Sequence, residues 1–272
     1  MTQTRLIATL LVAVIMGNVS SIADTIQVPG DFPTIQEAIE ASSSGDLIEV
    51  AAGTYQISEP LDPLGKAIEI RGALSEDGTP LTLIDGAGTT RILVIQNNET
   101  SETIFRNLDL RNGFLTGFGS LVRVVQGSPL FEDCHFRGGQ AVYKGGGFLV
   151  ENDSDVVFRR CRFQGNSCLG GGGAIFVDGT SMVLIEDSVI KENTAGVGAG
   201  LYINGLASAS LMNTKICGNT TDQVDGNYED LGGNEISDTC ECETGDLDSD
   251  ADGTPDCLDE CPEDPEKTEP GD

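Results

Sequence analysis

The residues whose types and spacing best suit chemistry lie near the C-terminus of this chain, in a run of aspartates around one glycine. The expected ligands of a Ca²⁺ ion are Asp248, Asp250, Asp252, Thr254, Asp256 and Asp259. Their spacing is that of a calcium-binding loop, in which Gly253 makes the sharp turn and Thr254 offers its backbone carbonyl oxygen. The last ligand is Asp rather than Glu and no amphipathic helix flanks the loop, so the motif is not a complete EF-hand. A solvated acidic run without a metal is the alternative interpretation.

The segment that carries this loop is too polar to form a core of its own. From Cys240 to Asp272 it has 14 Asp or Glu residues against one Lys, which accounts for 13 of the 29 net negative charges of the chain. Such a segment needs a metal or disulfides to hold a shape. We therefore assign residues 239–272 to a calcium-binding tail and residues 24–238 to the main domain.

The N-terminal segment, residues 1–23, has the features of a secretory signal. Arg5 supplies a positive charge, residues 6–17 are a short apolar run, and small residues precede the expected cleavage after Ala23. A buried strand or helix is the alternative. Because the apolar run is too short to span a bilayer, we expect a mature protein that is secreted or held at the cell surface or outer membrane, without a transmembrane span.

The cysteines agree with an oxidising compartment. They are Cys134, Cys161, Cys168, Cys217, Cys240, Cys242, Cys257 and Cys261. The four in the tail allow three pairings, among which the sequence does not choose. Zinc ligation is the competing interpretation, but export and the surrounding carboxylates favour disulfides. Cys134 and Cys161 occupy equivalent positions in adjacent repeats, where they either pair or stack as small buried groups.

A repeat of about 27 residues organises the chain before the tail. Gly119, Gly146, Gly173 and Gly200 are 27 residues apart, and a large apolar residue follows each at the second position: Leu121, Phe148, Ile175 and Tyr202. A second repeated segment begins at Phe105, Phe131, Phe158, Ile185 and Leu211. These apolar runs are too short for helices and are bounded by glycines and polar residues, so they predict strands. Each repeat then forms one coil of a parallel β-solenoid, an all-β fold.

Residues at equivalent positions should stack in columns along the solenoid. One column is Arg106, Glu132, Arg159 and Glu186, and the next is Asn107, Asp133, Arg160 and Asp187. Alternating charge is what stacked neighbours prefer. A third column, Asn166, Asn193 and Asn219, predicts a ladder of side-chain amides. A fourth, Arg111, Arg137, Gln164 and Lys191, is mostly basic, and either contacts an anionic polysaccharide or is a solvated face.

The repeat is looser before residue 121. Strand candidates there are residues 25–28, 47–50, 67–70, 81–84 and 92–95. A short helix is expected within residues 31–41, where Thr34 and Glu37 fit a capping box and Ile35, Ala38 and Ile39 form an apolar face. Such a helix would cover the first coil, which is otherwise an exposed sheet edge.

Two stretches resemble known families. The tail sequence DLDSDADGTPDCLDECP, residues 246–262, resembles a thrombospondin type 3 repeat, which implies calcium-stabilised structure outside the cell. The central region resembles right-handed parallel β-helix proteins of the pectin-lyase-like superfamily. The GGAI element at residues 172–175 and the FQGN element at residues 163–166 are similar to the repeats of polymorphic outer membrane proteins. Residues 31–41 and 53–55 are similar to the start of pectin methylesterases.

Catalytic residues are not evident. The carboxylates that an enzyme of this superfamily would need are represented by Asp85, Asp109, Asp133, Asp178 and Asp187. We expect Asp133 and Asp187 to be part of a salt-bridged ladder with Arg160 and Asp85 to lie in a turn, and the DFIFG element of pectin methylesterases is absent. His135 is the only histidine, which excludes a histidine pair and favours a structural role.

Composition limits the partners. A net charge of −29 argues against nucleic acid and anionic membranes, and the absence of Trp with 5% aromatic residues gives no evident platform for stacking sugars. We predict an exported, non-catalytic protein for surface display, adhesion or matrix interaction, with an extracellular polysaccharide or a surface protein as partner. The alternative is a polysaccharide-active lyase, esterase or glycoside hydrolase.

Overall fold

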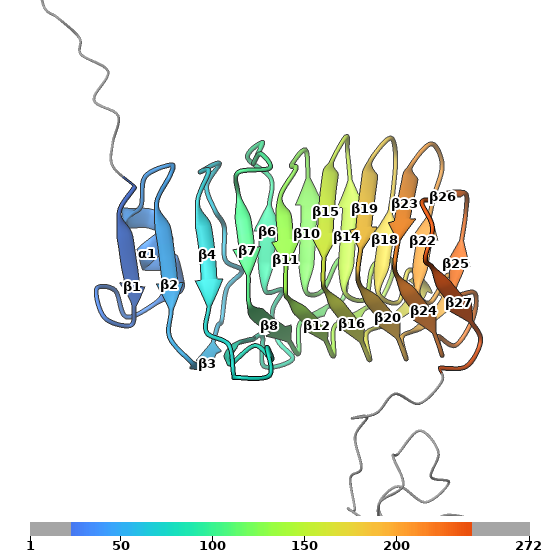
Figure 1. The fold of residues 1–272 in the computed structure, drawn as a ribbon, viewed down its shortest axis with the longest axis horizontal. Helices are drawn as coiled ribbons and strands as arrows, with labels where there is room; N and C mark the ends of the chain where they lie inside the picture. Colours follow the sequence, from blue (N-terminus) through green and yellow to red (C-terminus); the bar gives the residue numbers. More distant parts are fainter. Residues whose placement is uncertain (1–22, 241–272) are drawn as a thin grey trace, which may run out of the picture.

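The computed structural model describes residues 23–240, which form a solenoid of parallel strands (Figure 1). The calcium-binding loop and all of the predicted signal except Ala23 lie outside these residues. Within them, no helix is long and apolar enough to cross a membrane. The predicted all-β solenoid is confirmed.

Each full coil contributes strands to several parallel sheets that run along the solenoid. The nine-stranded sheet contains β1 (Thr25–Val28), β2 (Leu47–Val50), β4 (Glu69–Gly72), β7 (Ile104–Arg106), β11 (Leu130–Glu132), β15 (Asp155–Arg159), β19 (Met182–Glu186), β23 (Ser208–Met212) and β26 (Tyr228–Asp230). The eight-stranded sheet contains β3 (Gly53–Gln56), β5 (Thr82–Asp85), β8 (Leu108–Arg111), β12 (His135–Arg137), β16 (Arg162–Gln164), β20 (Val189–Lys191), β24 (Lys215–Cys217) and β27 (Glu235–Ser237). The six-stranded sheet contains β6 (Leu93–Ile95), β10 (Val122–Val125), β14 (Phe148–Glu151), β18 (Ile175–Val177), β22 (Leu201–Ile203) and β25 (Val224–Asp225). The four-stranded sheet contains β9 (Phe114–Leu115), β13 (Gln140–Ala141), β17 (Ser167–Gly171) and β21 (Thr194–Val197).

The register of the second repeated segment is as predicted, because Phe105, Phe131, Phe158 and Ile185 pair in succession. Their aromatic rings stack inside the solenoid, with centroids 4.9 Å apart for Phe105 and Phe131 and 5.6 Å apart for Phe131 and Phe158. All of these side chains are buried. Like residues in successive coils therefore build one continuous apolar core.

The register around the glycines differs from the prediction. The strand partners are Val122, Phe148, Ile175 and Leu201, so the expected alignment of Leu121 and Tyr202 with Phe148 and Ile175 is wrong by one residue at each end. The glycines that share a left-handed conformation are Gly119, Gly145, Gly172 and Gly198, with φ of 61°, 64°, 70° and 52°. Runs of neighbouring glycines hid this column, because a fixed spacing of 27 passes through Gly146 and Gly173 instead.

The predicted N-terminal helix is α1 (Ile35–Ala41), and Ile35, Ala38 and Ile39 are its buried residues. The Thr34 hydroxyl accepts a hydrogen bond from the Glu37 amide, which is half of the expected capping box. The C-terminal end of α1 is held by a residue that the sequence did not indicate. Lys66 donates from Nζ to the carbonyl oxygens of Ile39, Glu40 and Ser42, where a cation also favours the helix dipole.

The cysteines are paired differently from the expectation for the tail. Cys240 forms a disulfide with Cys217, the last residue of β24, and not with another tail cysteine. Gly218 makes room for it, since a Cβ there would lie 3.2 Å from the Cys240 sulfur. Cys134 and Cys161 are free and buried, so they stack rather than pair. Burial raises the pKa of the Cys134 thiol to about 12, which keeps it protonated.

Candidate functional site

The predicted metal ligands, Asp248 to Asp259, lie outside the described residues. Within residues 23–240, no group of three or more His, Cys, Asp or Glu side chains is placed to hold a metal ion. The outer face of the eight-stranded sheet, which carries the predicted basic column, is the candidate surface for a site.

This face presents two columns of side chains. Arg111, Arg137, Gln164 and Lys191 pair in succession as predicted, and the column continues to Cys217. The second column consists of Asp109, His135, Arg162, Val189 and Lys215. Between the two columns, Leu110, Phe136, Phe163, Ile190 and Ile216 point into the core, where they are buried. Alternation along short strands thus places both polar columns outside.

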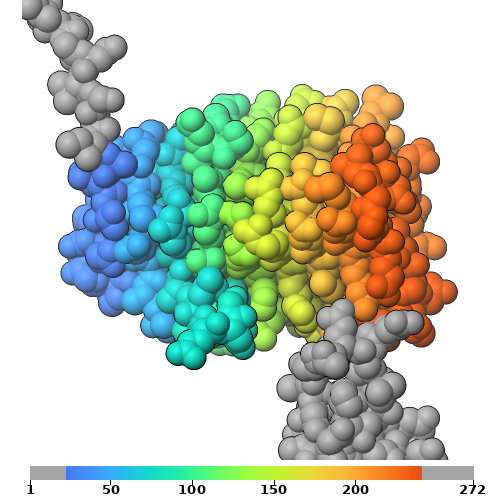
Figure 2. Space-filling model, in the orientation of Figure 1, coloured from blue at the N-terminus to red at the C-terminus, as the bar shows by residue number. Residues whose placement is uncertain are grey.

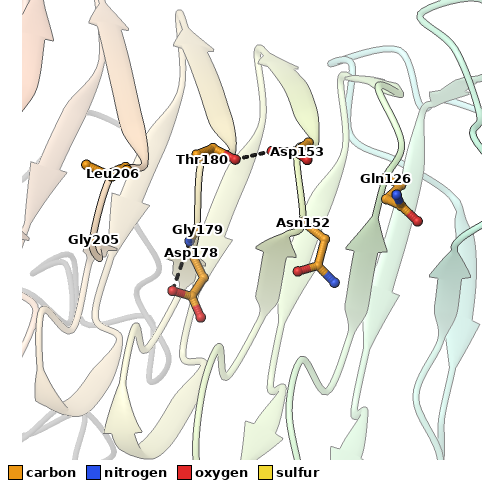
Figure 3. Close-up of a pocket in the computed structure, with 8 residues that line it drawn as sticks. All are labelled: Gln126, Asn152, Asp153, Asp178, Gly179, Thr180, Gly205 and Leu206. Atoms are coloured by element: carbon orange, nitrogen blue, oxygen red, sulfur yellow. Dashed lines mark hydrogen bonds between the residues drawn. The ribbon is translucent and has the colours of Figure 1, made fainter.

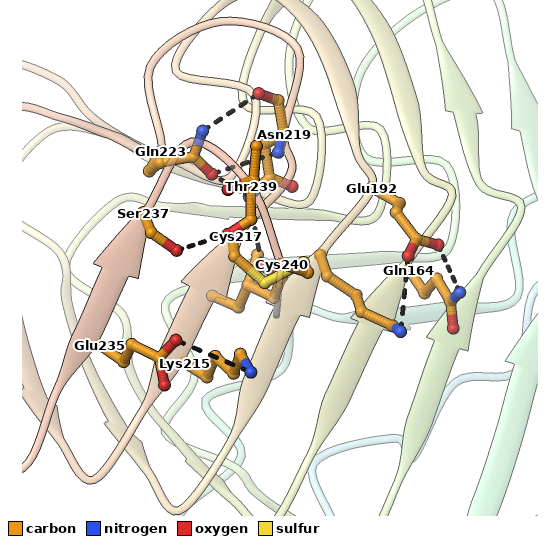
Figure 4. Close-up of a disulfide and its surroundings, with 12 residues drawn as sticks. Gln164, Glu192, Lys215, Cys217, Asn219, Gln223, Glu235, Ser237, Thr239 and Cys240 are labelled. Carbon is orange, nitrogen blue, oxygen red and sulfur yellow. Dashed lines mark hydrogen bonds and ion pairs between the residues drawn. A yellow bond between two sulfur atoms is a disulfide. The ribbon is translucent and has the colours of Figure 1, made fainter. Parts of the chain in front are cut away.

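Most cations of these columns are neutralised by a carboxylate. Arg111 pairs with Asp85 at 3.2 Å, Arg137 with Asp109, and Lys191 with Glu192 at 3.4 Å. Lys215 pairs with Glu235 at 3.7 Å (Figure 4). The face therefore carries a series of ion pairs rather than a continuous basic strip.

Arg162 is the exception. Among residues 23–240 it is the one arginine whose side chain takes part in no hydrogen bond and no salt bridge. Its neighbour Arg159, by contrast, pairs with Glu186 at 2.7 Å, and Arg160 pairs with Asp133 at 2.7 Å. A guanidinium without a counterion beside a groove is a ready partner for an external anion.

The groove beside Arg162 has a volume of about 460 Å³. Its lining residues are Asp77, Gly78, Thr79, His135, Phe136, Arg137, Arg162 and Gln164. Strands β12 and β16 form its floor, and the loop of residues 73–81, between β4 and β5, forms its rim. That loop protrudes from the surface in Figure 2 (cyan).

The rim loop is held in shape by short-range bonds. Leu74 and Pro80 form an antiparallel bridge, and Asp77 accepts hydrogen bonds from the Ser75 hydroxyl and, at 3.1 Å, from the Thr79 amide. The Ser75 hydrogen bond is the main reason why the pKa of Asp77 lies below its usual value. Asp77 is therefore an ionised acceptor at the mouth of the groove.

His135 is neutral in this setting. Burial is the main cause that lowers its pKa, and the charges of Arg162 and Arg137 lower it further, against the opposing effect of Asp109. Asp109, whose side chain is 2% exposed, is occupied by two hydrogen bonds from Arg137. The groove thus offers one unpaired cation, a neutral imidazole and the Asp77 carboxylate. A guanidinium suits the carboxylate of an acidic sugar, and Asp77 can accept its hydroxyl groups.

The carboxylates considered as catalytic candidates are all engaged elsewhere. Asp85 and Asp109 accept from arginines, as described above, and Asp133 pairs with Arg160. Asp187 accepts from the Asn213 amide at 3.1 Å rather than from Arg160. Asp178 accepts from Lys144 at 2.5 Å and from Asn204 at 2.7 Å.

A second groove, of about 630 Å³, follows the turns between the six-stranded and nine-stranded sheets (Figure 3). Asp178, Asp153 and Asn152 line it together with Gly179 and Thr180. Its acidic groups are satisfied within the turns, since Asp153 accepts from the Thr180 hydroxyl and Asp178 from the Gly179 amide. It contributes no cation, so the groove at Arg162 is the better candidate for an anion.

Of the groove residues, His135 and Arg137 stood out in the sequence, whereas Arg162 and Asp77 did not. Arg162 could have been found from the register, because it follows His135 by 27 residues on the same outer face. Asp77 gave no signal of its own, since its loop interrupts the repeat.

Residues 83–241 match a family model described as a right handed beta helix region. A search of curated proteins gives no match. Among solved structures, the chain is similar to the pectate lyase Pel9A, with 17% identity and a TM-score of 0.48, over 79% of this chain and 68% of that one. It is also similar to a pectin methylesterase from Aspergillus niger, with 15% identity and a TM-score of 0.38, over 82% of this chain and 92% of that one. No conclusion about activity follows from these similarities.

Proposed function

Because the chain belongs to the right-handed β-helix family, whose fold does not fix an activity, we propose that it is an exported binding protein. Its ligand is an anionic polysaccharide outside the cell, and the groove at Arg162 holds one acidic sugar unit without cleaving it. The unpaired guanidinium of Arg162 carries this proposal. The sugar carboxylate lies against Arg162, and its hydroxyl groups lie against Asp77.

The absence of cleavage is supported by the state of the carboxylates. General acid and base catalysis needs a titratable group that is free to exchange a proton with the substrate. Asp109, the buried carboxylate nearest to the groove in register, is held by Arg137. Surface display, adhesion or matrix interaction follows as the role of a protein that binds without turnover.

Binding should depend on Arg162. The probe is an oligomer of galacturonate, and its dissociation constant is measured by calorimetry at low salt. Arg162→Gln should weaken binding about tenfold or more, because a hydrogen bond to a charged group contributes about 1.5–3 kcal/mol. Arg71→Gln is the matched control, since it removes an arginine that is paired with Glu69 on another sheet. Equal losses of affinity in both variants would mean that only the net charge of the protein matters, and would contradict the proposal.

One observation favours an enzyme instead. His135 is neutral and lies in the same groove as an unpaired cation, which suits a base that acts beside a bound uronate. Incubation of the purified protein with polygalacturonate and alginate tests this alternative. Turnover that is lost in His135→Gln but retained in Arg71→Gln would show that the protein is an enzyme rather than a binding protein.

We further infer that the tail binds Ca²⁺ through Asp248, Asp250, Asp252, Thr254, Asp256 and Asp259, and that the protein is secreted or lies at the cell surface. The spacing of oxygen ligands and the resemblance to a thrombospondin type 3 repeat support the metal. The predicted signal and the resemblance of the coils to polymorphic outer membrane protein repeats support the location.

The calcium site is tested by titrating the mature, oxidised protein with Ca²⁺. Asp252→Ala should weaken binding at least about tenfold, because it removes a charged ligand from the loop. Asp264→Ala, which removes an acidic residue of the same tail outside the motif, should leave the affinity unchanged. A titration without any saturable binding would exclude the site.

A further inference from the structure

The disulfide fixes the start of the acidic tail on the face that carries the candidate groove. Cys217 continues the column that runs through Arg137, Gln164 and Lys191, and only Ser237 of β27 follows it. Cys240 is bonded to it, and a Cβ at Gly218 would lie within 4.0 Å of both the Cys240 sulfur and the Glu192 side chain. Figure 4 shows the disulfide on the same side of the sheet as Glu192 and Gln164. The chain after Cys240 therefore begins two strands away from Arg162.

We propose that residues 241–272 dock on the groove at Arg162 and occupy it in competition with the anionic ligand. The occupant is thus the acidic tail of the same chain, and its docking makes the groove autoinhibited. The autoinhibition rests on the proposed function, because it requires the groove to bind a ligand. The docking of the tail does not depend on that function.

Reach and charge both support this contact. Neighbouring strands are about 4.8 Å apart, so β16 lies about 10 Å from β24 along the column. An extended chain spans about 3.3 Å per residue, so three or four residues after Cys240 suffice. Glu241, Glu243 and Asp246 fall in or just after this stretch. The other cations of the face already have carboxylate partners, which leaves Arg162 as the place where an added carboxylate gains most.

His135 provides a direct reporter, because it is the only histidine and lines the same groove. The charged groups around it are Asp109 on β8, Arg137 on β12, Arg162 on β16 and Asp77 on the rim loop. A docked tail adds carboxylates to this set, and nearby negative charge raises the pKa of a histidine.

The experiment follows the imidazole signals of His135 by NMR as a function of pH. It compares the mature chain, a chain that ends at Cys240, and the full-length variant Glu241→Gln/Glu243→Gln/Asp246→Asn, which keeps the fold and length. The His135 pKa should fall by about 0.5 or more in both altered chains at low salt. The difference should disappear at about 1 M salt, where charges are screened beyond about 3 Å, and in the Arg162→Gln background. Identical titration curves for all chains would overturn the docking.

Binding of the galacturonate oligomer separates the two proposals. If the tail competes, the chain that ends at Cys240 should bind the oligomer about tenfold or more tightly than the mature chain. Equal affinity of both chains would overturn the autoinhibition. If neither chain binds while the His135 titration still depends on the tail, the docking is supported and the proposed function fails.

Discussion

Buried amides show at the scale of single residues why the coils stay in register. Asn166 donates from Nδ2 to Asn193 Oδ1 at 3.0 Å, and Asn193 donates to Asn219 Oδ1 at 2.9 Å. The predicted ladder is thus confirmed, but it has one more member, since Asn219 donates to Gln223 Oε1 at 2.8 Å. Asn193 also donates to the carbonyl oxygens of Phe163 and Lys191. Inside a dry core, each of these groups needs its partner.

Asn193→Ala should therefore lower the free energy of unfolding by about 3 kcal/mol or more, because it leaves the Asn166 amide and two carbonyl groups unpaired at about 1–3 kcal/mol each. Urea denaturation of the purified variant measures this. Asn227→Ala, at an exposed asparagine, is the control and should have almost no effect. A loss below 1 kcal/mol would mean that water replaces the amide.

At the scale of the element, four coils turn into the six-stranded sheet, at β10, β14, β18 and β22, through a glycine with positive φ. Gly119, Gly145, Gly172 and Gly198 hold this conformation three residues before their strands pair. A Cβ at Gly145 would lie 2.1 Å from the Phe148 carbonyl oxygen, so these corners exclude a side chain by space as well as by backbone angle.

Gly145→Ala should be much more harmful than Gly165→Ala. The φ of Gly165 is 63° and nearly equals the 64° of Gly145, but a Cβ at Gly165 meets no atom within 4 Å. The control should lose only about 1–2 kcal/mol from the left-handed backbone, whereas Gly145→Ala must also shift the Phe148 carbonyl. Thermal unfolding of both variants measures the difference. Similar melting temperatures would show that the corner relaxes.

At the scale of the whole molecule, the disulfide links the last coils of the solenoid to the tail. It spans 23 residues of sequence, so the loop that it closes should contribute about 3 kcal/mol to stability through the unfolded chain. It also fixes Cys240, the last described residue, beside the ion-paired face.

Cys217→Ser/Cys240→Ser should lower the free energy of unfolding by about that amount. At low salt, where charges are least screened, it should also abolish any effect of the tail on the pKa of His135. Denaturation with and without a reductant measures the first effect. The reductant should destabilise the natural chain more than the double variant. Peptide mapping that finds Cys240 joined to Cys242, Cys257 or Cys261 would contradict the pairing.

Much of the fold follows from the sequence because stacked coils repeat their chemistry. The phenylalanines, the buried asparagines and the alternating charges recur at matching positions, so the sequence alone places Phe131, Asn193 and Glu132. Thr34 and Glu37 likewise predicted the start of α1, since a capping box is a local interaction. The looser strands were found with shifted bounds: residues 67–70 against Glu69–Gly72, and 81–84 against Thr82–Asp85.

The tertiary structure decided what local pattern leaves open. Where several glycines adjoin, spacing alone cannot choose between Gly145 and Gly146, and only the backbone angle and the strand pairing do. Whether a cation is paired depends on side chains one coil away, so Arg162 is distinguished from Arg160 only in three dimensions. The groove needs the rim loop with Asp77, which interrupts the repeat, and the Cys217–Cys240 bond joins two segments that no periodicity relates. The sequence by itself determined the repeating solenoid, because each coil meets its own copy, and the structure alone determined the site, because its parts come from outside that repetition.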